Sequence, residues 1–197
     1  MILLETDRLL IRNWEERDRP LFHLINSDDR VMEFFPFRRS RAQADARMDE
    51  IAAGIVADGF GFACAELKAT GEPIGFIGLD RIDHLDPHMP AGSIEIGWRL
   101  APQFWRKGYA SEGASAWLDF GFERLALDEI VSIAVWNNEA STTVMRKIGM
   151  RRDQSSDFDH PQAPSDQPDL ERIVVYRISR TEWQKQRATA AGRPLEG

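Results

Sequence analysis

Residues 93–111 read SIEIGWRLAPQFWRKGYAS, and two different periodicities meet in this stretch. Up to position 100 apolar and polar residues alternate, which predicts a half-exposed strand. Its apolar face carries Ile94, Ile96, Trp98 and Leu100, and its other face carries Glu95, Gly97 and Arg99. From about Tyr109 the apolar residues recur at helical spacing, in the order Ala110, Ala114, Trp117, Leu118, Gly121, Phe122 and Leu125. We therefore expect a strand, a short loop and a helix.

The loop between that strand and that helix carries the chemistry. Gly108 allows successive backbone N–H groups to point inward, and the start of a helix adds unpaired donors and a partial positive charge. Arg106 and Lys107 add positive charge beside them. This combination suits a pyrophosphate group. The alternative is an ordinary turn glycine flanked by two solvated bases, because short glycine motifs are weak evidence by themselves.

The rest of the chain predicts one domain over residues 1–186, followed by a disordered tail at 187–197. Before the central strand we expect a strand at 7–14 and a helix at 15–27 with Leu21, Leu24 and Ile25 on its apolar side. A second helix runs from the Ser40 cap to Gly59, with Met48, Ile51, Ala52, Ile55 and Val56 at helical spacing, and a hairpin of 60–68 with 74–82 follows. After it we expect a strand at 129–136, a helix capped by Asn138 or Asn137 that ends at Gly149 with Ala140, Val144 and Ile148 inward, and strands at 150–158 and 170–178. The fold class is mixed α/β, with a mostly antiparallel central sheet and helices on both faces.

Composition narrows the classes of function. The 197 residues include 32 acids and 25 bases spread through both halves, for a net charge of -7, which argues against nucleic-acid binding and permits a cationic substrate. No apolar run approaches the length of a membrane span, so we expect no membrane partner. A single cysteine, Cys64, favours a reducing compartment, and we expect a cytoplasmic protein in which Cys64 is a small buried side chain. The His and Asp residues of 83–88 are interpreted as a loop without metal.

Residues 102–112, PQFWRKGYASE, resemble the pyrophosphate loop of the GCN5-related N-acetyltransferases, in the branch of the ribosomal-protein N-terminal acetyltransferases. A second match lies at 138–150, where NEAS runs on to KIGM. Weaker matches are TDRLLIR at 6–12 and IEIGW at 94–98, so the resemblance covers roughly residues 5–183. Two separate motifs in the expected order favour the cofactor assignment.

The resemblance implies that acetyl-coenzyme A is the acyl donor. It implies backbone contacts to the pantetheine arm from Trp98 and Leu100, and places Asn138 and Ser141 near the thioester. It also implies pyrophosphate contacts from Arg106, Lys107, Gly108, Tyr109, Ala110 and Ser111. Two positions depart from the family pattern. Trp105 replaces the usual Gln or Arg, and Met145 stands where many relatives carry a Tyr that protonates the leaving thiolate, which makes Ser141 the candidate acid.

Direct transfer requires a neutral amine to attack the thioester. An α-amino group titrates roughly 2.5 units below a lysine side chain, a difference of about 3.4 kcal/mol in its favour at neutral pH. Glu95 is the candidate base; the alternative is a surface carboxylate paired with Arg99. Ser141 has the alternative role of satisfying backbone groups in the first turn of a helix.

The identity of the acceptor stays open at this stage. A protein or peptide α-amine, a polyamine and an aminoglycoside are all compatible with the sequence. A second hypothesis is an acetyl-coenzyme A sensor without transfer activity, because Met145 replaces the family's Tyr. An exposed last strand would also allow a homodimer.

Overall fold

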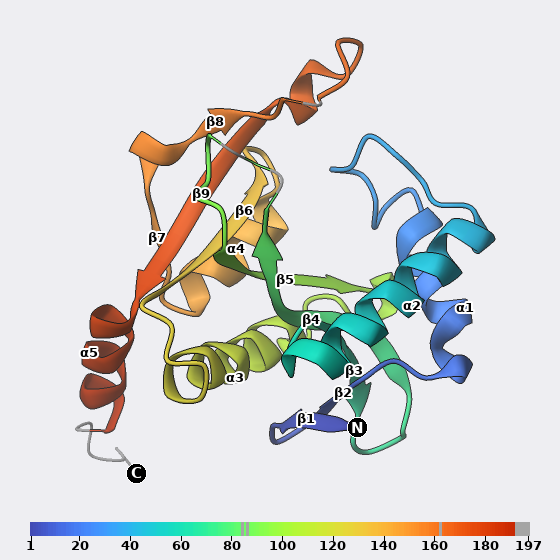
Figure 1. Ribbon diagram of the computed structural model, residues 1–197, viewed down its shortest axis with the longest axis horizontal. Coiled ribbons are helices and arrows are strands. Elements are labelled where there is room, and N and C mark those ends of the chain that lie inside the picture. Colours follow the sequence, from blue (N-terminus) through green and yellow to red (C-terminus); the bar gives the residue numbers. More distant parts are fainter. Residues whose placement is uncertain (84, 86, 162, 192–197) are drawn as a thin grey trace.

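The computed structural model describes residues 1–83, 85, 87–161 and 163–191, and its strands form one sheet of nine (Figure 1). The strand order is β1-β2-β3-β4-β5-β6-β9-β7, with β8 also paired to β9. The strands are β1 (Ile2–Glu5), β2 (Leu9–Arg12), β3 (Phe62–Leu67), β4 (Pro73–Ile82), β5 (Ser93–Leu100), β6 (Glu129–Val135), β7 (Arg151–Arg152), β8 (Phe158–Asp159) and β9 (Arg172–Ser179). Every described pairing is antiparallel except that of β5 with β6. The expected mixed, mostly antiparallel sheet is confirmed.

Helices cover both faces of the sheet, as expected. They are α1 (Arg19–Ser27), α2 (Arg41–Asp58), α3 (Tyr109–Glu123), α4 (Glu139–Lys147) and α5 (Arg180–Ala191). In Figure 1, α1 and α2 lie together on one side of the sheet, and α3 lies on the other. Helix α3 approaches the sheet closely at Gly113, where an added Cβ would stand 2.5 Å from Cδ1 of Ile77 on β4. This close approach fixes the N-terminus of α3 relative to β5.

Local signals in the sequence set several helix ends correctly. Ser40 caps α2 by accepting a hydrogen bond from the Gln43 amide, and Gly59 ends the helix with a φ of 78°. Asn138 caps α4 by accepting from the amide of Ser141, and Gly149 follows that helix with a φ of 88°. These contacts lie within a few residues of each other, which explains why the sequence predicts them.

Three apolar residues expected to face inward are exposed. Leu24 is 39% exposed, Val56 is 71% exposed, and Ala140 is also on the surface. Those predictions were wrong because helical spacing alone does not show how much of a helix the neighbouring layer covers. Cys64, by contrast, is fully buried, as expected.

The boundaries differ most near the two ends of the chain. Strand β1 was not predicted, and the predicted helix at 15–27 begins only at Arg19, after a 3₁₀ turn at Glu16–Asp18. The single strand predicted at 150–158 is two short strands, β7 and β8, separated by a 3₁₀ turn at Gln154–Ser156. Helix α5 includes residues 187–191 of the segment expected to be a disordered tail, and 192–197 lie outside the described residues.

Strand β9 pairs with β6 on one side and with β7 and β8 on the other, so it does not offer the exposed edge on which the homodimer expectation rested.

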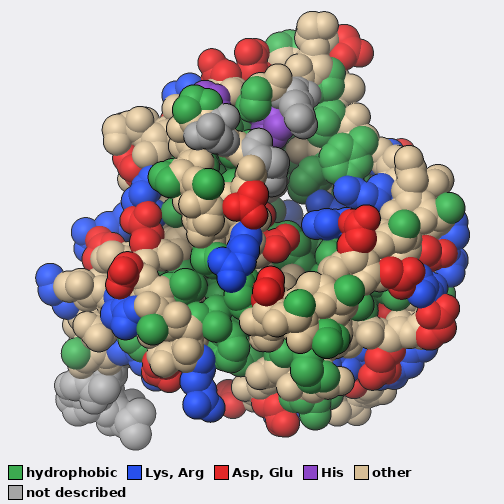
Figure 2. All heavy atoms as spheres, viewed as in Figure 1, with side chains coloured by type: hydrophobic (Ala, Val, Ile, Leu, Met, Phe, Trp, Pro, Cys, Tyr) green, Lys and Arg blue, Asp and Glu red, His purple; other side chains and the backbone are tan. Residues whose placement is uncertain are grey.

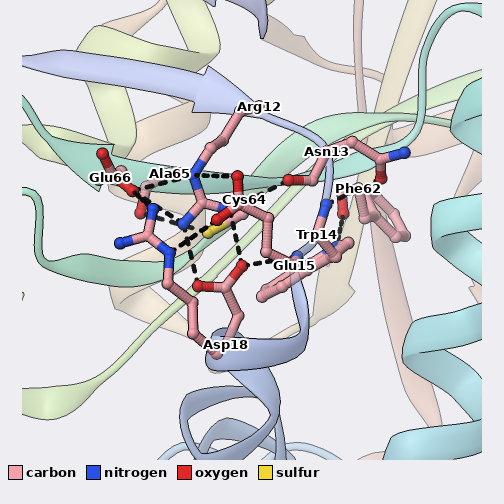
Figure 3. A network of polar contacts seen from close by, with 10 residues as sticks. Arg12, Asn13, Trp14, Glu15, Asp18, Phe62, Cys64, Ala65 and Glu66 are labelled. Carbon is pink, nitrogen blue, oxygen red and sulfur yellow. Dashed lines mark hydrogen bonds and ion pairs between the residues drawn. The ribbon is translucent and has the colours of Figure 1, made fainter. Parts of the chain in front are cut away.

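A buried charge network fixes the first strands to the turn before α1 (Figure 3). Arg12 on β2 is 3% exposed and donates to both carboxylate oxygens of Asp18, at 2.6 and 2.9 Å. Its Nε donates to Oε2 of Glu66 on β3 at 2.8 Å. Asp18 is fully buried, so this guanidinium supplies the cation that its carboxylate requires.

Within the described ranges, none of the helices combines the length and the apolar composition that crossing a membrane requires.

Candidate functional site

The strands β5 and β6 diverge in the middle of the sheet. Their parallel ladder has one described bridge, between Glu95 and Val131. Beyond it, the carbonyl oxygen of Ile96 accepts from Oγ of Ser132 at 2.9 Å, and that of Leu100 accepts from the Trp105 indole at 2.7 Å. Backbone groups alternate in direction along an antiparallel strand, so the N–H and C=O of Trp98 face the same side as those of Ile96 and Leu100. This edge of β5 can pair with an extended ligand that carries amides.

The loop after β5 has the backbone conformation of an anion site. Arg106 has a φ of 59° and Gly108 a φ of 82°. A non-glycine residue in the left-handed region is uncommon and often marks a functional loop. Gly108 is also the N-cap of α3 and provides no side-chain cap. The first amides of α3, from Tyr109 to Ser111, therefore lack helical partners and carry the positive end of the helix dipole.

A pocket of about 410 Å³ opens at this helix N-terminus. Its lining residues are Arg8, Lys107, Gly108, Ser111, Glu112, Ser115 and Lys147. Arg8 is held in place because its Nε donates to Oε2 of Glu112 at 2.6 Å and its Nη1 donates to the Lys107 carbonyl at 3.0 Å. Burial alone would raise the pKa of Glu112, but hydrogen bonds from Thr6 and Arg8 outweigh it and lower that pKa below its ordinary value. The pocket therefore combines uncapped amides with basic side chains.

The sequence analysis missed two basic residues of this pocket, Arg8 and Lys147. Arg8 lies in the stretch TDRLLIR, which was noted only as a weak family match. Lys147 ends α4 and lies in the KIGM part of the second family match, which the sequence analysis did not connect with the pyrophosphate. Both reach the loop only through the packing of α3 and α4 against the sheet.

Glu95 lies on the face of β5 opposite Ile94 and Ile96, directly across from Asp80 on β4. Burial, and secondarily the negative charge of Asp80, raise the pKa of Glu95 to about 7. The alternative pairing with Arg99 is absent from the described contacts, because four residues along a strand span about 13 Å. Arg99 instead donates from Nη1 to Oδ1 of Asn26 on α1, at 2.8 Å. Glu95 is thus a half-buried carboxylate whose proton is exchangeable near neutral pH.

The N-terminus of α4 holds the other candidate residues. The Ser141 amide donates to Oδ1 of Asn138 at 3.0 Å. The Ser141 side chain is half-buried, and among the described residues its hydroxyl has no hydrogen-bond partner, so the side chain that satisfies a backbone group here is that of Asn138. Met145 is fully buried and belongs to the main hydrophobic core. This position therefore contributes packing rather than a proton donor.

Comparison with known proteins identifies the family. The acetyltransferase (GNAT) domain family matches residues 8–151. The chain belongs to the GNAT acetyltransferase family. A Bacillus subtilis relative described as uncharacterized N-acetyltransferase YnaD is 33% identical over 153 residues, covering 76% of this chain and 83% of that protein. A GNAT-family acetyltransferase from Bacillus anthracis, 27% identical, superposes with a TM-score of 0.74 over 92% of this chain and 99% of its own.

A ribosomal-protein α-N acetyltransferase, RimL, in complex with coenzyme A shares the fold, with a TM-score of 0.71 over 91% of this chain and 98% of its own at 15% identity. The GNAT assignment makes the chain a transferase, and the divergence of β5 from β6 next to the uncapped α3 lies within the matched segment. Among the described residues, no group of three or more His, Cys, Asp or Glu side chains is placed to hold a metal ion. His84 and Asp86, from the segment interpreted as a loop without metal, lie outside the described residues.

Proposed function

We propose that this GNAT acetyltransferase binds acetyl-coenzyme A with the diphosphate at the N-terminus of α3 and transfers the acetyl group to a primary amine. The observation that carries the proposal is the uncapped first turn of α3 behind Gly108, which faces a basic pocket. A diphosphate fits this donor set because the amides from Tyr109 to Ser111 satisfy its oxygens while Lys107 and Lys147 add charge. RimL, a relative in fold, is described in complex with coenzyme A, which agrees with this assignment.

The pantetheine arm would lie along the edge of β5 toward which the backbone N–H and C=O groups of Trp98 and Leu100 point. This direction leads from the pyrophosphate loop toward the bridge between Glu95 and Val131, where the strands separate. We place the thioester near that bridge, with Asn138 and Ser141 at the N-terminus of α4 beside it. We assign these positions from the family resemblance and from the point at which β5 and β6 separate.

Glu95 is the proposed general base. Its carboxylate would accept a proton from the ammonium form of the acceptor, directly or through water, and the neutral amine then attacks the thioester carbonyl. The raised pKa of about 7 matches this task, because the group is largely ionised slightly above neutral pH and still basic enough to take a proton. Ser141 is the proposed donor of a proton to the departing thiolate. The favoured acceptor is an α-amino group of a protein or peptide, since its pKa lies near that of Glu95.

Three further points stay proposals. The likeness to ribosomal-protein N-terminal acetyltransferases would make a protein N-terminus the acceptor, with polyamines and aminoglycosides as the alternatives. The cytoplasm is the expected compartment, which agrees with the free, buried Cys64. The homodimer stays a proposal, and we assign its interface to a surface other than β9, which pairs with β7 and β8. A protein that binds acetyl-coenzyme A without releasing free coenzyme A in the presence of any amine would be a sensor instead.

The test compares Gly108→Val with Lys107→Ala by calorimetric titration of coenzyme A. Each amide bonded to a charged phosphate contributes about 1.5–3 kcal/mol, whereas an exposed lysine contributes about 1 kcal/mol or less. Lys107 is exposed, and a side chain at Gly108 would be strained at its φ of 82°. We expect Gly108→Val to weaken binding far more than Lys107→Ala.

A matched control is Gly71→Val, in the turn between β3 and β4, where φ is 69° and the space around the glycine is open. This variant imposes a similar backbone strain away from the loop and should keep its affinity for coenzyme A. The reverse ranking of Gly108→Val and Lys107→Ala would reject the role of the backbone donors.

A further inference from the structure

Two arginines meet at one neutral oxygen between α1 and β5. Arg99 on β5 and Arg39 in the α1–α2 connection both donate from Nη1 to Oδ1 of Asn26, at 2.8 and 3.1 Å. Asn26 is 2% exposed, and its amide group donates to the Phe22 carbonyl one turn earlier in α1, at 2.8 Å. This bond fixes the orientation of the amide, so its oxygen faces the two guanidinium groups.

Neither guanidinium has a carboxylate partner in the structure as described. The other arginines of the described residues that are withdrawn from solvent, such as Arg12, Arg19 and Arg177, lie within 4.0 Å of at least one carboxylate. Arg39 and Arg99 have none within that distance among the described residues, although both are half-buried. Burial, and secondarily the charge of Arg39, lower the pKa of Arg99 to about 9, which still leaves it charged at neutral pH.

Aromatic rings hold both cations without neutralising them. The Cζ atom of Arg99 stands 4.3 Å from the ring centre of Phe35 and 5.4 Å from that of Phe76. Arg39 stands 4.5 Å from the ring centre of Phe37. Stacking occupies the faces of a guanidinium and leaves its in-plane N–H groups available. In the described contacts each guanidinium uses only Nη1, for Asn26, so several donors remain for a ligand.

The arginine pair lies on the same side of the sheet as the proposed base. Arg99 is opposite Phe76 in the β4–β5 ladder and Glu95 is opposite Asp80, so side chains at both positions project from one face of β5. A pocket of about 250 Å³ lies beside Arg39, and its lining residues are Phe37, Arg38, Arg39 and Gln43. In Figure 2, basic side chains gather beside a hollow at the centre of the view, on the side where Figure 1 draws the α1–α2 connection.

We propose that Arg39 and Arg99 form an anion-binding subsite of the acceptor site, which takes the carboxylate of an acceptor amine. The inference rests on the proposed function, because the role of Glu95 is what makes this face the acceptor side. Two converging guanidiniums are suited to the planar, two-oxygen geometry of a carboxylate. Their uncompensated charge is costly until an anion arrives, so binding of that anion is strongly favoured.

The spacing of the two groups defines the acceptor further. Glu95 and Arg99 are separated by about 13 Å between α-carbons, so the amine and the carboxylate of the acceptor are several bonds apart. A peptide with a free N-terminus and a Glu residue shortly after it is the simplest such molecule. Polyamines and aminoglycosides carry positive charge only and would be repelled by the arginine pair.

The experiment compares short peptides that share a free N-terminus and carry either Glu or Gln at the second, third or fourth position. For the wild-type enzyme we expect kcat/KM for the best Glu peptide to exceed that for its Gln partner by about tenfold or more, the factor given by one hydrogen bond between charged groups. Arg39→Gln and Arg99→Gln should bring this ratio close to one. Arg30→Gln is the matched control, because Arg30 is an exposed arginine of the same α1–α2 connection, binds Asp28 instead and does not line the pocket beside Arg39.

A second measurement separates this subsite from the transfer reaction. The same peptides with acetylated N-termini, which resemble products, are titrated into the protein in the presence of coenzyme A. Preference for the Glu peptide in wild type and in Arg30→Gln, lost in Arg39→Gln and in Arg99→Gln, supports the subsite even if no peptide is acetylated. Equal binding of Glu and Gln peptides to the wild type, or a preference that survives both substitutions, overturns it. Transfer to amines without any preference for acidic peptides would reject the subsite and leave the proposed function standing.

Discussion

Arg12 and Arg99 are arginines on two strands of the same sheet, and both are withdrawn from solvent. Arg12 is bound by Asp18 and Glu66, and this network closes within the protein (Figure 3). Arg99 is bound by a neutral amide oxygen that it shares with Arg39. Burial lowers the pKa of Arg12, but the hydrogen bonds to Asp18 and Glu66 outweigh it and raise the pKa, whereas the pKa of Arg99 is lowered to about 9.

Arg12 is therefore a structural cation, whereas we propose that Arg99 binds a ligand. The Arg12 network has both signs of charge in place before any ligand arrives, so it stabilises the fold and has no charge left for binding. The face of β5 that carries Glu95 and Arg99 holds a carboxylate and a guanidinium that do not pair with each other among the described contacts. Such groups reduce stability in the free protein, and under our proposals they gain their partners from substrate.

The largest expected effect comes from breaking the closed network. Arg12→Met would leave Asp18, which is fully buried, without its cation, and we expect the free energy of unfolding to fall by about 3–5 kcal/mol. Urea unfolding at neutral pH measures this loss. Arg17→Gln is the control, because Arg17 also contacts Glu66 but its side chain is 54% exposed, and its loss should cost about 1 kcal/mol or less. Equal losses for the two variants would show that the buried Arg12 network stabilises the fold no more than an exposed ion pair does.

The second effect concerns Glu95, the half-buried carboxylate on β5. Because its pKa is raised from 4.5 to about 7 in the folded protein, the proton on Glu95 stabilises the fold at about pH 4.5 and below. This contribution is lost as the pH rises through about 7. Glu95→Gln should therefore be more stable than wild type by about 1–3 kcal/mol at about pH 8 and equal to it at about pH 4.5.

Unfolding of both proteins at the two pH values provides this measurement, with Glu72→Gln in the exposed β3–β4 turn as a control expected to show no such dependence. The same ionisation should make the wild-type transfer rate rise through about pH 7. A pH–rate profile of Glu95→Gln that coincides with that of wild type would exclude Glu95 as the base.

The smallest expected effect concerns Arg99. Arg99→Met removes a half-buried charge that has no carboxylate partner, and Arg39 still satisfies Oδ1 of Asn26. We expect the free energy of unfolding without ligand to stay constant or to rise by about 1 kcal/mol. Thermal or urea unfolding of the unliganded protein measures it. A loss comparable to that of Arg12→Met would show that Arg99 is a structural cation as well.

Much of the fold could be predicted because its signals are short in range. The Ser40–Gln43 capping box, the glycine ends at Gly59 and Gly149 and the alternation of β5 depend on residues a few positions apart. The same holds for the loop before α3, whose left-handed glycine and uncapped helix start are contained in one short stretch. The errors lie where distant packing decides, as at Val56, and in β7 and β8, which are defined by their pairing with β9 rather than by a pattern of their own.

The sequence by itself determined most of the order of elements, several helix ends and the conformation of the loop before α3. A few neighbouring residues determine backbone conformation there, and main-chain donors are present whatever the rest of the chain does. Only the tertiary structure decided which charges are compensated. Arg8 meets Glu112, Arg12 meets Glu66, and Arg99 meets Asn26 across large separations in sequence. The pKa of Glu95 depends in the same way on its burial and on Asp80 in the next strand. Solvation and Coulomb energies depend on distances in space, and the order of residues along the chain does not contain them.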